Sequence, residues 1–180
     1  MLRHIGCVHE WVAGMVNTAA SELQPFPSAP EFAGDALADW ADECRHALLE
    51  ALSDADPDRP MWVLGSQRPT RFWARRQAHE TAVHAVDATA AAGEAWAIPG
   101  DVADDGLVEL LTVFLPVQWH QRPPNWGDGR TVHFHRTDGE GERILTSGQD
   151  LLLWAVNRPS SVELIGDAGL AAAWADHVRF

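Results

Sequence analysis

Lysine and tyrosine are absent from this chain, and all 13 of its basic residues are arginine. Acidic residues number 26, so the formal net charge at neutral pH is −13. Nucleic acids and anionic membranes attract basic surfaces, which a chain of this balance does not offer. We therefore expect neither a nucleic-acid partner nor a membrane partner.

Cysteine is scarce, with only Cys7 and Cys44 in the chain. Two cysteines do not make a disulfide framework, which favours a reducing, cytoplasmic location. The start of the chain has no long apolar core of the kind that signal peptides carry. The longest strongly apolar runs, such as residues 151–156, are too short to span a bilayer.

Helical periodicity dominates the first two thirds of the chain. Residues 54–69 form a proline-rich connection, and Pro116 is expected to stop the last of these helices. Thr70 is the expected N-cap of the third helix, and Gly93 is its expected C-cap glycine. The predicted helices cover residues 2–23, about 35–53, from after 70 to near 93, and about 102–115.

Beyond Pro116 the pattern changes to short elements. Alternation of apolar and polar residues predicts strands, and periodic segments between them predict helices. The expected strands cover residues 131–137, 143–146 and 161–165, and the expected helices cover residues 151–157 and 167–178. The sequence therefore predicts the α+β class, with a helical domain over residues 1–120 and a small α+β domain over residues 126–180.

The third predicted helix places a carboxylate and an imidazole on one face. Glu80 and His84 are four residues apart, which separates them by about 40° around a helix. Asp87 falls on the same stripe and could orient the imidazole. Such a pair lets one helix supply two ligands to a metal ion, although His79 and His84 are five apart and do not form the two-histidine zincin motif.

A simpler interpretation of the same stripe stays open. Arg76, Glu80 and His84 are spaced as a ladder of polar pairs that water could solvate. Arg76 precedes Glu80, which is the less favourable order for an exposed pair, and this weakens the simpler interpretation slightly.

A third metal ligand has to come from another segment. His4 lies on the buried stripe of the first helix, whereas His9 lies about 140° away from it. A buried histidine needs a polar partner, and a shared metal or a backbone carbonyl would each supply one. His133 and His135 share one face of a predicted strand and are further candidates.

These motifs carry a resemblance to a known family. The stretch from Phe72 to Asp87, which contains the letters HETAVH, resembles the third helix of the actinobacterial, mycothiol-dependent maleylpyruvate isomerase family. Other segments resemble the family's first ligand helix, its fourth helix and its sterol-carrier-like second domain. They are residues 2–11, residues 106–116, and residues 150–154 with 166–168.

The resemblance implies a DinB/YfiT-like, metal-binding helical bundle followed by a sterol-carrier-like domain. Family members carry a further helix ahead of the position where this chain begins, so the resemblance implies a bundle without its first helix and a shortened second domain. A bundle that lacks a helix exposes apolar surface, which favours a homodimer. The resemblance also implies a divalent metal, with zinc expected, held by His4, Glu80 and His84, and mycothiol as the co-substrate.

The function that follows is a thiol-dependent isomerase or S-transferase. Three protein ligands leave a coordination position open, as in catalytic zinc sites. A thiolate would add to an activated double bond of a small acidic or electrophilic substrate. Arg76 and Arg158 are the candidates for holding the substrate's carboxylate, and a surface ion pair is the alternative for both.

Two other functions stay open at this point. The chain could be a non-catalytic metal-binding or ligand-binding module, such as a degenerate or truncated paralogue. It could also be a structural helical domain without a metal, in which the polar stripe is merely solvated.

Overall fold

The computed structural model describes residues 1–121, 134, 148–164 and 168–178. The chain divides into two compact units, Met1–Ala95 and Trp96–Phe180. The described residues are mostly helical and include one two-stranded sheet, which confirms the α+β class in this coarse form. None of the described helices combines the length and apolar character that a membrane crossing requires.

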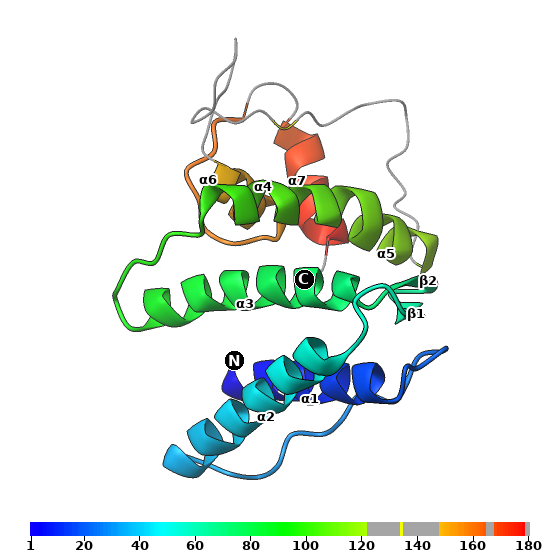
Figure 1. Cartoon of the computed structure of the whole chain (residues 1–180). Helices are drawn as coiled ribbons and strands as arrows, with labels where there is room; N and C mark the ends of the chain where they lie inside the picture. The colour runs from blue at the N-terminus through cyan, green and yellow to red at the C-terminus, as the bar shows by residue number, and fades with distance from the viewer. Residues whose placement is uncertain (122–133, 135–147, 165–167, 179–180) are drawn as a thin grey trace. The chain divides into compact units, whose positions relative to one another are not determined.

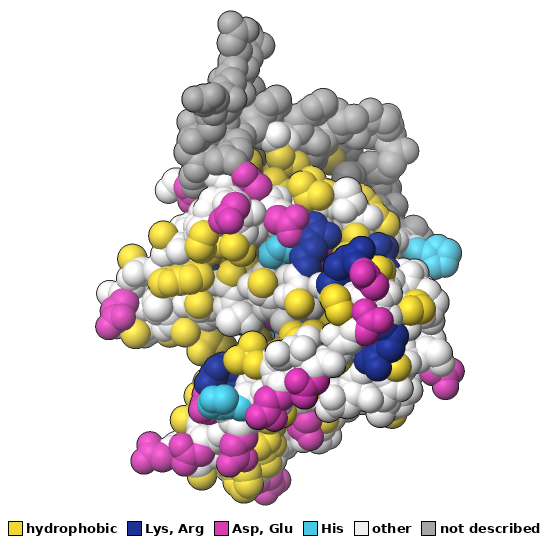
Figure 2. All heavy atoms as spheres, viewed as in Figure 1, with side chains coloured by type: hydrophobic (Ala, Val, Ile, Leu, Met, Phe, Trp, Pro, Cys, Tyr) yellow, Lys and Arg dark blue, Asp and Glu magenta, His cyan; other side chains and the backbone are white. Residues whose placement is uncertain are grey.

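Three long helices build the first unit: α1 (Leu2–Asn17), α2 (Asp35–Asp54) and α3 (Arg71–Ala91). Packing of α1 on α2 forms much of the core, and α1 also contacts α3 (Figure 1). Val12, Met15 and Val16 on α1 are completely buried because they share one stripe of the helix. The side of α2 that lies opposite its buried residues is acidic and exposed, and Figure 2 shows its carboxylates on the surface.

A β-hairpin occupies part of the segment for which we predicted only a proline-rich connection. Strands β1 (Pro60–Val63) and β2 (Ser66–Pro69) pair antiparallel through a two-residue turn. Leu64 and Gly65 both have positive φ, as such a tight turn requires. The hairpin was not predicted because leucine is a poor turn signal and because the prolines suggested an irregular connection. Pro60 and Pro69 in fact stand at the outer ends of the strands, where they do not disturb the pairing.

The hairpin joins α1 to α3. The Trp62 amide donates to the carbonyl of Ala20, just after α1, at 2.7 Å. The buried Trp73 indole, in the first turn of α3, donates to the carbonyl of Trp62 at 3.2 Å. Thr70 is the N-cap residue, as predicted, but its hydroxyl donates to the carbonyl of Arg59 instead of capping an amide of the helix. The hairpin thus fixes the start of α3.

The end of α3 also follows the prediction. Gly93 adopts φ 74°, a left-handed conformation that favours glycine. The amides of Gly93 and Glu94 donate back to the carbonyls of Ala90 and Thr89, which closes the last turn.

Five short helical segments make up the described part of the second unit: α4 (Gly100–Glu109), a π-helical turn η1 (Leu110–Phe114), α5 (Leu115–Gln121), α6 (Gly148–Ala155) and α7 (Ala168–His177). The prediction that Pro116 stops the helix was wrong. Pro116 lies in the first turn of α5, where its missing N–H is not needed. The widened turn before it, in which the Leu115 amide donates to the Leu110 carbonyl, allows the chain to continue as a helix.

None of the three predicted strands of the second domain is confirmed. Residues 161–164 form no strand, so that prediction was wrong; the Ser161 amide donates to an Asp150 side-chain oxygen rather than to a neighbouring strand. The strands predicted at 131–137 and 143–146 lie outside the described residues, apart from Phe134. The domain division at about residue 120 remains a prediction, although the contact-defined unit boundary falls earlier, between Ala95 and Trp96.

Two glycines of α1 offer a matched test of the α1–α2 contact. A Cβ atom at Gly6 would lie 2.6 Å from Cη2 of Trp40 on α2, whereas one at Gly14 would meet nothing within 4 Å. We predict that Gly6→Ala lowers the free energy of unfolding by about 1–3 kcal/mol through overpacking. Gly14→Ala should raise it by up to about 1 kcal/mol because alanine favours the helix. Urea unfolding measures the free energy of unfolding of both variants. Equal changes in the two variants would show that Gly6 is not tightly packed against Trp40.

Candidate metal centre

The α3 helix presents four polar side chains along one stripe: Arg76, Glu80, His84 and Asp87. Their spacing of three and four residues keeps them on one face of the helix. The stripe is not solvated, because the side chains of Arg76 and Glu80 are only 8% and 10% exposed. Such burial is unusual for charged groups unless they are paired.

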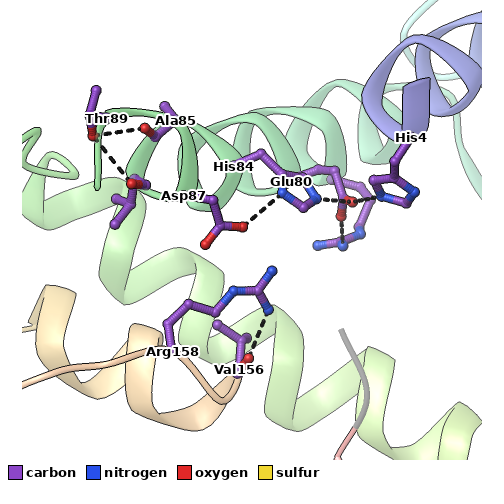
Figure 3. Close-up of polar contacts among 10 residues, drawn as sticks. His4, Glu80, His84, Ala85, Asp87, Thr89, Val156 and Arg158 are labelled. Carbon is purple, nitrogen blue, oxygen red and sulfur yellow. Dashed lines mark hydrogen bonds and ion pairs between the residues drawn. The ribbon is translucent and has the colours of Figure 1, made fainter. Parts of the chain in front are cut away.

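His4 comes from the first turns of α1 and completes a cluster with two residues of α3. Its Nε2 atom lies 3.2 Å from Oε1 of Glu80, and Nε2 of His84 lies 3.3 Å from the same oxygen. Figure 3 shows the three side chains turned toward one another. Of the residues that the structure describes, only these three form a group able to hold a metal, with their ligand atoms within 4.8 Å of one another.

The spacing of these atoms fits a zinc ion. Ligands about 2.0–2.1 Å from a tetrahedral ion lie about 3.3 Å apart. The two separations from the Glu80 oxygen, 3.2 and 3.3 Å, are close to this value, and all three ligand atoms lie within 4.8 Å of one another. Two imidazoles and one carboxylate also form a ligand set that zinc takes in catalytic sites.

Asp87 orients the imidazole of His84. The Nδ1 atom of His84 lies 3.0 Å from Oδ2 of Asp87 (Figure 3). When Nδ1 carries the proton, Nε2 of the neutral ring is directed at Glu80 with its lone pair. That Nε2 atom is buried and pairs with Oε1 of Glu80 at 3.3 Å, although not in good hydrogen-bond geometry. A metal ion bound there would take the place of the proton between these two atoms.

Arg76 contacts the other oxygen of Glu80. Its Nη2 donates to Oε2, so the two carboxylate oxygens have different partners. Burial raises the pKa of Glu80, but contacts with His84, Arg76 and His4 outweigh burial and lower the pKa to about 2. Contact with the Glu80 carboxylate raises the pKa of His84, while burial opposes this. Glu80 is therefore ionised at neutral pH and can act as a ligand.

The structure brings His4, Glu80 and His84 together and leaves the other candidates out of the cluster. His9 is buried on α1 but is not part of the group, and burial is the main reason that its pKa is lowered. His133 and His135 lie outside the described residues. Arg158 belongs to the second unit, where its Nη1 donates to the carbonyl of Val156 at 2.8 Å.

The α3 helix buries more polar groups than its sequence predicts. His79 is 3% exposed and Gln77 is 5% exposed, and neither belongs to the metal-ligand group. Gln77 and His79 are about 160° apart around α3, on opposite flanks of the Arg76–Glu80 stripe, so the stripe gave no signal for their burial.

Residues 1–89 match the model of the mycothiol maleylpyruvate isomerase N-terminal domain. These residues belong to that domain family. The match contains His4, Glu80, His84 and Asp87, so every residue of the cluster lies within the family's domain. The resemblances over residues 106–116, 150–154 and 166–168 lie beyond the matched range and remain predictions. Comparison with curated proteins and with solved structures gave no match.

Competition between protons and zinc for the His84 imidazole provides a test of metal binding by the cluster. Because the pKa of His84 is raised above 6.5, a metal that binds its Nε2 must displace a proton over a wider pH range. We predict that zinc affinity falls as the pH drops through the raised pKa of His84, and that His84 alone contributes up to roughly tenfold per pH unit below that pKa. Glu80 adds nothing to this slope because its pKa is about 2.

Titration calorimetry in buffers of different ionisation enthalpy would count the protons released. The His46→Ala variant is the control, since His46 is exposed on α2 away from the ligand group. An affinity independent of pH would contradict zinc binding through His84.

Proposed function

We propose that this chain is a divalent-metal, mycothiol-dependent enzyme of the maleylpyruvate isomerase type, and that His4, Glu80 and His84 hold the metal. The observation that carries the proposal is the convergence of these three side chains within a domain of that family. Zinc is the proposed ion because its usual ligand spacing matches the cluster. The proposed fold is the DinB/YfiT-like bundle over residues 1–120, with a small second domain over residues 126–180.

A bound divalent cation would supply one chemical effect, which is to lower the pKa of a thiol so that its thiolate exists at neutral pH. Glu80 and the two histidines would hold that cation with three donors, which leaves a position free for a ligand from solution. Asp87 would keep His84 in the tautomer that donates from Nδ1. The proposed partners are therefore a low-molecular-weight thiol and a small electrophilic or acidic substrate.

The proposed reaction begins with addition of the thiolate to an activated carbon–carbon double bond. Rotation about the resulting single bond and elimination of the thiolate would give the isomer, and the thiol is regenerated. Without elimination, protonation of the adduct gives an S-conjugate. The same cluster serves both outcomes, so isomerase and S-transferase activities are both within the proposal. Arg158 remains the proposed anchor for a substrate carboxylate.

Metal content provides the first test. Protein purified without added metal should contain about one zinc per chain. Glu80→Ala should contain almost none, and Glu94→Ala, which removes an exposed carboxylate just past α3, should match the wild type. His4→Ala is the second variant, because the His4 side chain is 50% exposed and its loss puts folding at little risk. Negligible zinc in the wild type would defeat the metal proposal.

Thiol chemistry provides the second test. We expect the zinc-loaded protein to accelerate consumption of mycothiol and of an activated, cis-configured unsaturated acid. His4→Ala should lower this rate at least about tenfold, because one of three ligands is lost. Product analysis would separate isomer from conjugate. Zinc without any acceleration would favour the non-catalytic metal-binding module instead.

A further inference from the structure

We propose that Arg76 is a positioning residue, which holds one oxygen of the Glu80 carboxylate so that only the other oxygen is presented to a metal. This inference rests on the metal site of the proposed function. It concerns how the ligand is held, which is a separate question from whether a metal binds.

The two oxygens of Glu80 have different partners. Oε2 accepts a hydrogen bond from Nη2 of Arg76, one helical turn earlier on α3. Oε1 lies within 3.3 Å of the Nε2 atoms of both histidines (Figure 3). One carboxylate oxygen therefore pairs with a guanidinium, and the other oxygen faces the two histidines.

This division matters for the coordination of a metal. A carboxylate can bind a cation through one oxygen or through both. If Glu80 used both oxygens, it would occupy the coordination position that a tetrahedral site with three protein ligands leaves open. A guanidinium on Oε2 competes with a metal for this oxygen and disfavours binding through both oxygens, which keeps the free position available to a ligand from solution.

Burial makes this contact different from a surface ion pair. Exposed ion pairs contribute little because water screens them and their side chains are free to move. Here both side chains are at most 10% exposed, and the planar guanidinium is a rigid donor. The oxygen that Arg76 holds is therefore kept from turning toward the histidines.

The same contact changes the expectation for Arg76. The sequence suggested that this arginine anchors the carboxylate of a substrate. The structure places its Nη2 on the protein's own carboxylate, and its side chain is buried. This arrangement favours positioning of Glu80 over recognition of a substrate.

Cobalt substitution tests the inference without an activity assay. The visible bands of Co²⁺ are intense in four-coordinate sites and weak when the coordination number rises. We expect Co²⁺-loaded Arg76→Gln to show weaker visible bands than the wild type, because Glu80 can then bind through both oxygens. Chelator competition should also show zinc affinity lowered by about 10–100-fold, as for other groups that orient metal ligands.

Arg75→Gln is the matched control. It removes the same charge from the neighbouring position of the same helix, about 100° away from Arg76 around the helix axis, and the Arg75 guanidinium lies 5.5 Å from the centre of the Phe72 ring. We expect its cobalt spectrum and its zinc affinity to equal those of the wild type. Far-UV circular dichroism of both variants would show whether they fold.

The outcomes separate the two proposals. If the wild type binds neither Zn²⁺ nor Co²⁺, the metal proposal fails and this inference fails with it. If the wild type binds both and Arg76→Gln matches it in spectrum and affinity, the positioning role is overturned while the metal site stands. Should Arg76→Gln not fold, Arg76→Lys carries the test, because lysine keeps the charge but not the rigid guanidinium. Its zinc affinity should fall roughly threefold to tenfold, and equality with the wild type would overturn the inference.

Discussion

The candidate metal site of the first unit depends on the contacts that stabilise the buried carboxylate of Glu80. A buried carboxylate is costly unless opposite charges and donors surround it. Glu80 meets this requirement with Arg76 on one oxygen and with His4 and His84 near the other. Removing Arg76 would leave the buried carboxylate without its paired cation. The low pKa of Glu80, about 2, reports how well the surrounding groups compensate its burial.

The β-hairpin gives this cluster its alignment. It links the end of α1 to the start of α3, and the two helices then run in opposite directions past each other (Figure 1). His4 lies about as far from the end of α1 as His84 lies from the start of α3. Packing of the Trp73 side chain, which is 1% exposed, fixes the rotation of α3 about its axis. The same packing therefore determines which face of α3 meets His4.

The sequence predicted which side chains of α3 share a face better than it predicted the connections around them. The spacing of Glu80 and His84 is a local property of one helix, so periodicity alone places both residues on one face. The selection of His4 required the family resemblance as well, because the distance between α1 and α3 is not local information. The hairpin turn at Leu64 and Gly65 carried no strong signal, and its strands are held by contacts with α1 and α3. The helix through Pro116 depends on a π-helical turn, for which the sequence offered no rule.

Burial argues against the solvated interpretation of the α3 stripe. In water, a ladder with arginine ahead of glutamate is slightly unfavourable, and each pair would contribute only a few tenths of a kcal/mol. In the structure the ladder exists, but its central carboxylate is buried and shares one oxygen with an imidazole from another helix. An exposed ladder would not include an imidazole from α1 on the same oxygen. The proposed cation would bind Nε2 of both histidines together with this oxygen, in place of the ion pairs that the three side chains form.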